Sequence, residues 1–329
     1  MKYVLGIDQG GTKTAAIVMD CRGRILGAGR CSGAYHISDG IDTAMAAIGK
    51  AAEEACRQAG IPISGISAVG AGITGMDWPE DYRLLCPALE RVTGVHEIHL
   101  FNDVMGAFYS GAPHGVGAVL CAGTGLNAAV CSPAGEEFVF GFYIDEHDQG
   151  GSALAQRAIR CAFQSEMGLS EPTRLGGLFL RKSGERNIDG LLHRFVVDEE
   201  FSYSIKDLVP DIVACAESGD AVAIRLLEEF ASDISRYVRA GLQRFGMLDM
   251  ETDVVLSGSV LKGSPNRLRE NVMRDILAFA PNAHIVNARY EPVVGAAVAA
   301  LKSKAGRVDR KMLWKNIAAS AGRFDLERQ

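Results

Sequence analysis

The chain has 329 residues, of which 48% are hydrophobic and 22% are charged, and it carries a net charge of −6 at pH 7. This length predicts two domains, each able to bury an apolar core of its own. The acidic balance and the lack of a long Lys/Arg run argue against nucleic acid and anionic membranes as main partners, and they favour a small-molecule substrate.

The first third of the chain alternates strands with helices. Strands over 3–8, 14–20 and 24–29 form a hairpin meander, followed by a helix over 39–59 with Asp39 as its expected N-cap. A strand over 66–71, a helix over 79–92, a strand over 96–101 and a helix that starts over 104–109 come next. This alternation predicts the α/β class.

Residues 116–140 repeat the opening pattern, with strands over 116–121, 127–131 and 138–140 separated by short turns. Alignment of Gly11-Thr12 with Gly123-Thr124 also places Gly23 on Gly135 without a gap. The match predicts an internal duplication. Two glycine turns facing one another across a cleft would grip a polyphosphate from both sides.

The rest of the chain is mostly helical. Helices are expected over 152–163, 206–217 and 220–245, with an irregular stretch over 172–186 and a strand over 253–256 that ends in Ser257-Gly258-Ser259. Further helices follow Pro265 and start at Pro292. After Lys302 we expect either a surface helix or a frayed terminus. The predicted domains are 1–113, joined by a C-terminal helix at about 306–329, and 114–305.

The turn after the first strand has the composition of a phosphate cradle. Gly10 and Gly11 let backbone N–H groups approach anionic oxygens, and the Thr-Lys-Thr triplet adds hydroxyls and a cation. The carboxylate of Asp8 would repel phosphate unless a hydrated Mg²⁺ lies between them. The alternative is an ordinary strand that enters a glycine turn.

A second glycine pattern, Gly70, Gly72 and Gly75, matches the G-x-G-x-x-G dinucleotide signature. That signature needs a helix that starts within the turn, so that its N-terminus meets the pyrophosphate. Here Pro79 delays the helix by several residues. We therefore set the dinucleotide site aside, and the absence of a P-loop motif leaves β-turns as the expected nucleotide contacts.

Carboxylates and an amide supply candidate polar groups. Asp103 follows the strand over 96–101, where it is either the proton acceptor of a phosphoryl transfer or the N-cap of the next helix. Asn127 follows the second glycine turn and Asp148 precedes a helix, and both suit sugar hydroxyls. For Asp148 the alternative is a solvated turn.

The eight cysteines are scattered singly without a C-x-x-C pair, which argues against a zinc knuckle or a disulfide framework. The seven histidines show no metal-ligand spacing. No leader-type segment and no window of about 18 apolar residues occur. We expect a cytoplasmic protein without zinc, and the sequence leaves the oligomeric state open, a homodimer included.

Five segments resemble, in order, the phosphate loops, connecting segments and adenosine loop of the actin/Hsp70/sugar-kinase superfamily. They are residues 8–14, Asn102-Asp103, 122–125, Ser257-Gly258-Ser259 and 291–297. Within that superfamily the chain is similar to the BadF/BadG/BcrA/BcrD ATPase family, and most to its N-acetylglucosamine kinase-like branch. Residues 74–80, 123–127 and 147–152 carry this closer resemblance.

The resemblance implies two RNase H-like (actin-like ATPase) domains with a central cleft, which close on ATP, Mg²⁺ and a hexosamine such as N-acetylglucosamine. Asp103 would then be the catalytic base toward the sugar 6-hydroxyl, and Asp8 would hold Mg²⁺ through water. The implied nucleotide contacts are Gly10, Gly11, Thr12, Lys13, Thr14, Gly123, Thr124, Gly125, Ser257, Gly258 and Ser259. The implied sugar contacts are Asn127, Asp148, Tyr35, His36 and Thr74.

The chain departs from the family pattern in three places. Gln9 replaces a glycine, which the turn can absorb if that residue keeps φ < 0. Tyr35 and His36 stand where this branch usually carries an asparagine that contacts the sugar. Gln149 replaces an acidic residue beside Asp148, which could retune selectivity between an N-acetyl and a free amino sugar.

The family's other branch offers an alternative function. Its members activate 2-hydroxyacyl-CoA dehydratases or benzoyl-CoA reductases with an electron from a [4Fe–4S] cluster held between two subunits. Cys121 and Cys161 superficially resemble its cluster cysteines, but we expect both to be small buried residues. A filament-forming actin-like role is the remaining alternative.

Overall fold

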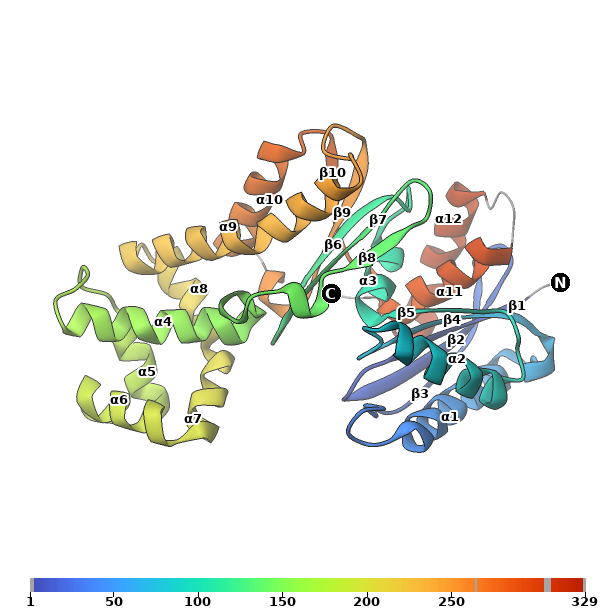
Figure 1. The fold of residues 1–329 in the computed structure, drawn as a ribbon, viewed down its shortest axis with the longest axis horizontal. Coiled ribbons are helices and arrows are strands. Elements are labelled where there is room, and N and C mark those ends of the chain that lie inside the picture. The colour runs from blue at the N-terminus through green and yellow to red at the C-terminus, as the bar shows by residue number, and fades with distance from the viewer. Residues whose placement is uncertain (1–2, 264, 305–308, 328–329) are drawn as a thin grey trace. The chain divides into compact units, whose positions relative to one another are not determined.

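The computed structural model describes residues 3–263, 265–304 and 309–327. Its contacts divide the chain into two compact units, one made of Met1–Val119 with Val286–Gln329 and the other of Leu120–Ile285. Each unit is built on one five-stranded sheet with helices packed on it, as Figure 1 shows. The α/β class is therefore confirmed.

The sheet of the first unit follows the predicted meander. Its strands are β1 (Tyr3–Gln9), β2 (Lys13–Asp20), β3 (Ile25–Ser32), β4 (Ile66–Ile73) and β5 (Ile98–Asn102), in the order β3-β2-β1-β4-β5. β1 runs antiparallel to β2 and parallel to β4, which in turn is parallel to β5. The carboxyl ends of β1, β4 and β5 therefore meet at one edge of the sheet.

Helices cover both faces of this sheet (Figure 1). One apolar cluster joins α1 (Ile41–Ala59) and α2 (Pro79–Thr93) to the sheet, and another joins α11 (Pro292–Lys304) and α12 (Arg310–Ser320) to the opposite face. α3 (Asp103–Gly111) follows β5 directly. Alternate residues of β1 enter the two clusters, as the pleat of a strand requires: Leu5 faces α1 and Val4 faces α11.

The Gly70-x-Gly72-x-x-Gly75 pattern has a packing role. A Cβ at Gly70 would lie 2.0 Å from the carbonyl oxygen of Ala296, so glycine lets α11 approach β4 closely. α2 begins at Pro79, as the sequence predicts, and not inside the turn. The helix terminus that a dinucleotide site needs is therefore not at this turn.

The start of α1 differs from the prediction. Gly40 occupies the N-cap position of α1 and makes no side-chain cap, so the expected capping role of Asp39 is wrong. Oδ2 of Asp39 instead accepts a hydrogen bond of 2.7 Å from the backbone N–H of Tyr35. A short Asp side chain bonds readily to a nearby backbone N–H, and here that bond closes the loop between β3 and α1.

The second sheet repeats the topology of the first. Its strands are β6 (Gly117–Ala122), β7 (Leu126–Cys131), β8 (Glu137–Val139), β9 (Thr252–Ser257) and β10 (Ala283–Asn287), in the order β10-β9-β6-β7-β8. Taken from β8 to β10, this is the order of β3 to β5 with each strand replaced by its counterpart five strands later. The predicted duplication is therefore confirmed at the level of strand order.

The helices of the second unit are α4 (Gly150–Glu166), α5 (Leu175–Ser183), α6 (Ile188–Val197), α7 (Glu199–Ser204), α8 (Val209–Glu217), α9 (Ala221–Arg244) and α10 (Arg267–Phe279). The expectation of an irregular stretch over 172–186 is wrong, because α5 lies there. Gly176 and Gly177 lower its intrinsic helix propensity, yet Leu175 and Phe179 are fully buried. Tertiary packing overrides propensity at this point.

Short 3-10 helices complete the chain, at Ile63–Gly65, Gly141–Tyr143, Glu146–Asp148, Ile205–Leu208, Ser259–Leu261 and Ala321–Phe324. Within the described ranges, no helix has the length and apolar character needed to cross a membrane.

The unit boundaries differ from the predicted domain boundaries. The predicted second domain, 114–305, includes α11, whereas the structure groups α11 with the first unit because it packs on β1 and β4. The boundaries fall instead inside β6 and β10. Part of the predicted C-terminal helix is α12; residues 305–308 and 328–329 lie outside the described part.

Candidate functional site

The first glycine turn joins β1 to β2. The backbone N–H of Gly10 donates to the carbonyl oxygen of Lys13 at 2.9 Å and closes the turn. A Cβ on Gly11 would meet nothing within 4 Å, and neither glycine is among the residues with positive φ. These glycines therefore leave open space over the backbone, which fits the close approach of a phosphate.

The side chains of this turn divide into two groups. Thr12 and Lys13 are exposed, and Lys13 Nζ lies 3.0 Å from Oε1 of Glu291, just before α11. Thr14 is fully buried and donates its hydroxyl to the carbonyl oxygen of Ser32 at 3.0 Å. Thr12 is therefore exposed, Lys13 is exposed but paired with Glu291, and the buried Thr14 hydroxyl binds the backbone of β3.

Gln9, the first departure from the family pattern, is absorbed by the sheet. It is fully buried at the end of β1, where its Nε2 donates to the carbonyl oxygen of Ala44 at 2.8 Å. Among the described residues other than glycine, only Asp325 has a positive φ, so Gln9 satisfies the expected condition of φ < 0. Asp8 precedes it and is 8% exposed.

Asp103 is the first residue of α3, at the carboxyl end of β5. The N-cap of α3 is Asn102, whose Oδ1 accepts from the backbone N–H of Val104 at 3.1 Å, so Asp103 is not the cap. Burial raises the pKa of Asp103 to about 6, and the negative charge of Asp77 also raises it. Hydrogen bonds from Val104 and Thr74 lower this pKa and offset part of the rise. A carboxylate with a pKa near neutrality suits general-base catalysis.

Two predicted sugar contacts, Tyr35 and Thr74, lie near Asp103, and a third, His36, lies beside Tyr35 and Asp81. The Thr74 side chain donates a hydrogen bond to Asp103. The Tyr35 ring packs directly against Gly75, because a Cβ added to Gly75 would lie only 2.4 Å from Tyr35 Cε2. Burial, followed by the charges of Asp77, Asp81 and Asp103, raises the pKa of Tyr35.

Sequence reasoning missed Asp77 as a member of this group. Its Oδ1 accepts from Nδ2 of Asn102 at 2.7 Å, so Asp77 and Asp103 are joined through adjacent residues of the β5–α3 corner. Burial and the charge of Asp81 raise the pKa of Asp77. The signal that could have found it is the acidic pair Asp77 and Asp81 around the helix start at Pro79.

The second glycine turn joins β6 to β7 and is tied to the start of α4. The backbone N–H of Gly123 donates to the carbonyl oxygen of Gly125 at 2.9 Å, while those of Gly151 and Ser152 donate to Gly123 and Thr124 at 2.8 and 3.0 Å. Gly150 has φ +52, and a Cβ there would lie 2.2 Å from the carbonyl oxygen of Gly125. The turn and the helix start therefore form one rigid corner.

The small-residue turn after β9 lies beside this corner. Gly258 has φ +96, and a Cβ there would be 2.1 Å from the carbonyl oxygen of Ala122. Gly123, Thr124 and Ser259 line one pocket of about 240 Å³. The pocket also includes residues that sequence reasoning missed: Gly151, Lys206, Asp207, Val209, Pro210 and Val260. Lys206 and Asp207 carried no motif that could have identified them.

Asn127 and Gln149 support the chain around the second turn. Oδ1 of Asn127 accepts from the backbone N–H groups of Ala128 at 2.9 Å and Gly141 at 3.1 Å. Oε1 of Gln149 accepts from the N–H of Leu126 at 3.2 Å. The neutral amide of Gln149 thus fixes the first residue of β7, which a carboxylate at that position could also do.

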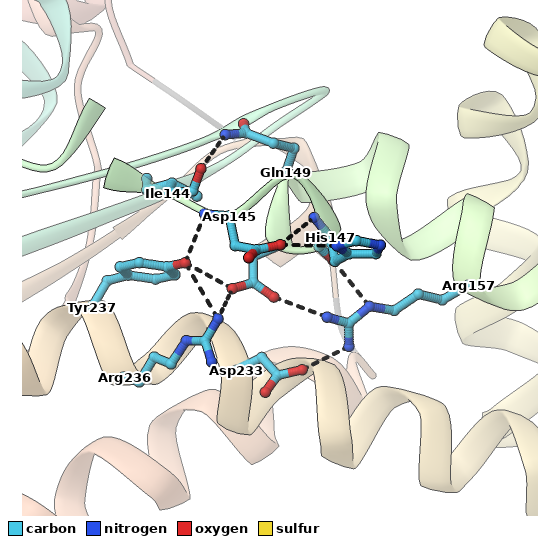
Figure 2. Close-up of polar contacts among 9 residues, drawn as sticks. Ile144, Asp145, His147, Gln149, Arg157, Asp233, Arg236 and Tyr237 are labelled. Atoms are coloured by element: carbon cyan, nitrogen blue, oxygen red, sulfur yellow. Dashed lines mark hydrogen bonds and ion pairs between the residues drawn. The ribbon is translucent and has the colours of Figure 1, made fainter. Parts of the chain in front are cut away.

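Asp148 is the centre of a polar network between α4 and α9, because Arg157, Arg236 and Tyr237 all donate to its carboxylate. Figure 2 shows these three side chains pointing toward one another. It is 1% exposed. Oδ1 accepts from Arg157 at 2.9 Å, and Oδ2 accepts from Tyr237 at 2.7 Å and from Arg236. Arg157 also contacts Asp233 at 2.7 Å.

This network limits what Asp148 can bind. A carboxylate has roughly four acceptor positions, and three protein donors already use this one. The hydrogen bond to Tyr237 and the charge of Asp148 raise the pKa of Arg236. The structure therefore assigns Asp148 first to positioning the loop before α4, and its predicted contact with a sugar hydroxyl stays a prediction.

Few side chains are placed to bind a metal ion. Within the part of the chain that the structure describes, no group of three His, Cys, Asp or Glu side chains could hold a metal ion. Asp8, near the carboxyl end of β1, fits the hydrated Mg²⁺ that phosphate sites hold with one or two carboxylates. Burial raises the pKa of Cys161, so this side chain favours the protonated thiol. Iron–sulfur clusters are bound by thiolates, which makes Cys161 a poor cluster ligand.

Comparison with known proteins gives one family and related kinases. Residues 5–300 match the model of the BadF/BadG/BcrA/BcrD ATPase family. The chain is 26% identical over 246 residues to the glucosamine kinase GspK of Vibrio cholerae serotype O1, covering 73% of this chain and 80% of that protein. It is 26% identical over 322 residues to the N-acetyl-D-glucosamine kinase of Dictyostelium discoideum, covering 91% and 98%.

Among solved structures, the fold is similar to the ROK hexokinase from Thermus thermophilus. The TM-score is 0.58 at 23% identity, and the alignment covers 92% of this chain and 100% of that one. At this identity the likeness shows the fold alone.

Proposed function

The chain belongs to the BadF/BadG/BcrA/BcrD ATPase family, and on this premise we propose that it is a cytoplasmic, ATP-dependent kinase for N-acetylglucosamine or a related hexosamine. The proposed acceptor is the 6-hydroxyl. The names of the two curated relatives support the class of reaction. The single observation that carries the proposal is Asp103, a largely buried carboxylate with a pKa of about 6 at the carboxyl end of β5.

In the proposed reaction Asp103 accepts the proton of the sugar hydroxyl. The hydroxyl oxygen then forms a bond to the γ-phosphorus, and the bond between that phosphorus and the bridging oxygen of ADP breaks. Thr74 holds the carboxylate through its side-chain hydrogen bond. Because its pKa lies just below neutral pH, Asp103 is mostly ionised at pH 7 and can take up the proton.

The phosphates are proposed to bind at both glycine turns. The open backbone at Gly10 and Gly11, the hydroxyl of Thr12 and the charge of Lys13 suit one part of the polyphosphate. Gly123, Thr124 and Gly125 suit another, and the pocket beside Ser259 suits the nucleoside. When bound, Mg²⁺ would neutralise charge on the transferring phosphoryl group; Asp8 is the residue proposed to hold it through water.

The sugar is proposed to lie against Tyr35, His36 and Thr74, the predicted contacts near Asp103. Asn127 and Asp148 remain predicted contacts. For Asp148 the network of Figure 2 leaves about one acceptor position. A homodimer stays a prediction.

A coupled assay of ADP release tests the function. Purified protein is given ATP, Mg²⁺ and, in turn, glucose, glucosamine or N-acetylglucosamine, and the product is identified by ³¹P NMR. At least one amino sugar should raise ADP release above the rate without sugar, with phosphate on the 6-hydroxyl. If no sugar raises the rate, the proposal fails; stoichiometric iron with a [4Fe–4S] spectrum would favour the activator branch instead.

A further inference from the structure

A cluster of carboxylates lies beside Asp103 in the first unit. It consists of Asp77 and Asp81, which flank the start of α2, together with Asp103 itself. The backbone N–H of Asp77 donates to Oδ2 of Asp81 at 3.0 Å, and Asn102 donates to Asp77 at 2.7 Å. Among the described residues, none of these three carboxylates forms an ion pair with a Lys or Arg.

Two aromatic side chains from the loop after β3 face this cluster. His36 is 7% exposed and both its ring nitrogens lack a hydrogen-bond partner, although its Nε2 points to Oδ1 of Asp81 at 3.9 Å. Tyr35 packs edge-to-face against His36, with ring centroids 5.6 Å apart. A buried polar ring without a partner normally marks a missing ligand or water.

The chemistry of the missing ligand follows from charge. Two or three carboxylates with at most one imidazolium leave an excess of negative charge in a partly buried place. Among the described residues, no three His, Cys, Asp or Glu side chains are placed to hold a metal ion directly. An ammonium group donates three hydrogen bonds, carries one positive charge and is also attracted by an aromatic face.

We propose that Asp77, Asp81 and His36, flanked by Tyr35, form a subsite for the protonated amino group of a free amino sugar. The subsite rests on the proposed kinase function and narrows its substrate to a hexosamine with an unacetylated amine. An N-acetyl amide carries no charge, so it would leave the carboxylates uncompensated. Asp77 acts on the amine, whereas Asp103 acts on the hydroxyl.

The position of the subsite gives the departure from the family pattern a physical meaning. Tyr35 and His36 replace the asparagine that the resemblance leads one to expect, and they are the residues that meet Asp77 and Asp81. An asparagine suits a neutral hydroxyl or amide partner. The His36 imidazole lies beside Asp81, and an imidazole nitrogen can accept a hydrogen bond from an ammonium group.

The test compares kcat/KM for glucosamine, N-acetylglucosamine and glucose in the full-length protein and in Asp77→Asn. The wild type should prefer glucosamine over both other sugars by about 10- to 100-fold, the worth of a charge-assisted hydrogen bond. In Asp77→Asn the ratio of kcat/KM for glucosamine to kcat/KM for glucose should fall to about 1, chiefly through a higher KM for glucosamine. The loss of the Asp77 charge beside Asp103 affects all three sugars alike and leaves this ratio unchanged. The asparagine keeps an acceptor oxygen for Asn102, so the β5–α3 corner is preserved.

Glu80→Gln is the matched control, because Glu80 lies on the same helix turn but its side chain is 72% exposed and pairs with Arg83. It should leave the sugar preference intact. Equal or better use of N-acetylglucosamine or glucose by the wild type would overturn the subsite and leave the kinase function standing, as would an equal loss on all three sugars in Asp77→Asn. If Asp77→Asn does not fold, the wild-type preference alone decides. No turnover with any sugar would defeat the kinase function, and the subsite with it.

Discussion

Replacement of Asp103 by asparagine should lower activity and raise stability at the same time. The substitution keeps the shape of the side chain and an acceptor for Thr74, but it removes the basic oxygen that takes the hydroxyl proton. Loss of a general base costs about 10²- to 10⁴-fold in kcat. The KM for ATP should change little, because Asp103 is not among the proposed phosphate contacts.

The stability effect follows from the pKa of Asp103. Burial raises this pKa from its ordinary value of 3.8 to about 6. The folded state therefore binds the proton more tightly than the unfolded chain, and the stabilisation from the neutral form is complete below about 3.8 and lost as the pH rises through about 6. The difference corresponds to about 3 kcal/mol at most. Because asparagine stays neutral, the Asp103→Asn variant should be more stable than the wild type above pH 6. Near pH 4 the two proteins should be equally stable.

The assay combines coupled ADP release with urea unfolding between pH 4 and 8. Wild-type kcat/KM should rise with pH through an apparent pKa of about 6, since the base must be ionised. Asp42→Asn, on the exposed first turn of α1, is the control that should change neither quantity. Near-normal turnover of Asp103→Asn would refute the base assignment, and a stability difference that does not depend on pH would refute the burial argument.

Lys13→Met should raise the KM for ATP by about 10-fold or more, because it removes a charge-assisted contact to phosphate; Lys50→Met on α1 should not, and equal KM values would reject the cradle. Gly258→Ala should destabilise the protein far more than Gly263→Ala. Both glycines have positive φ, at +96 and +88, but only at Gly258 would a Cβ meet backbone atoms within 4 Å. The control, Gly263→Ala, should lower the free energy of unfolding by about 1 kcal/mol. Equal urea midpoints for Gly258→Ala and Gly263→Ala would contradict the packing argument. Asp148→Asn should cost about 1–3 kcal/mol of stability, since its arginine partners lose their counter-charge; an unchanged midpoint would show that the network carries no stability.

The first unit was largely predictable because its signals are local. Short apolar strands, a proline at the start of α2 and glycine turns are each recognisable from a few neighbouring residues. The strand order of the second sheet could be expected from the repeat of Gly11-Thr12 at Gly123-Thr124. The capping prediction failed because an Asp side chain before a helix can bond either to the helix N-terminus or to another nearby backbone N–H. Asp39 bonds to the N–H of Tyr35 instead of capping α1.

Other features depend on long-range packing and could not be derived from one sequence. α5 forms because Leu175 and Phe179 are buried by distant segments, although two glycines weaken its local helix signal. Arg157 and Arg236 reach Asp148 from α4 and α9, one of them 88 positions away. The grouping of Asp77 with His36 likewise requires the loop after β3 to meet the start of α2.

The duplicated sheets also differ in a way that bears on the chemistry. Under the alignment of Gly11 with Gly123, Asp8 corresponds to Leu120 and Lys13 to Gly125, so the charges of the first turn have no counterparts in the second. The second turn instead binds the start of α4 through uncharged groups, mostly of the backbone. Asp8, Lys13 and Asp103 all belong to the first unit, so the residues proposed to hold the metal, to contact phosphate and to act as the base lie in the same compact unit. The two units therefore share a strand order, but the charged groups proposed for phosphoryl transfer are concentrated in the first unit.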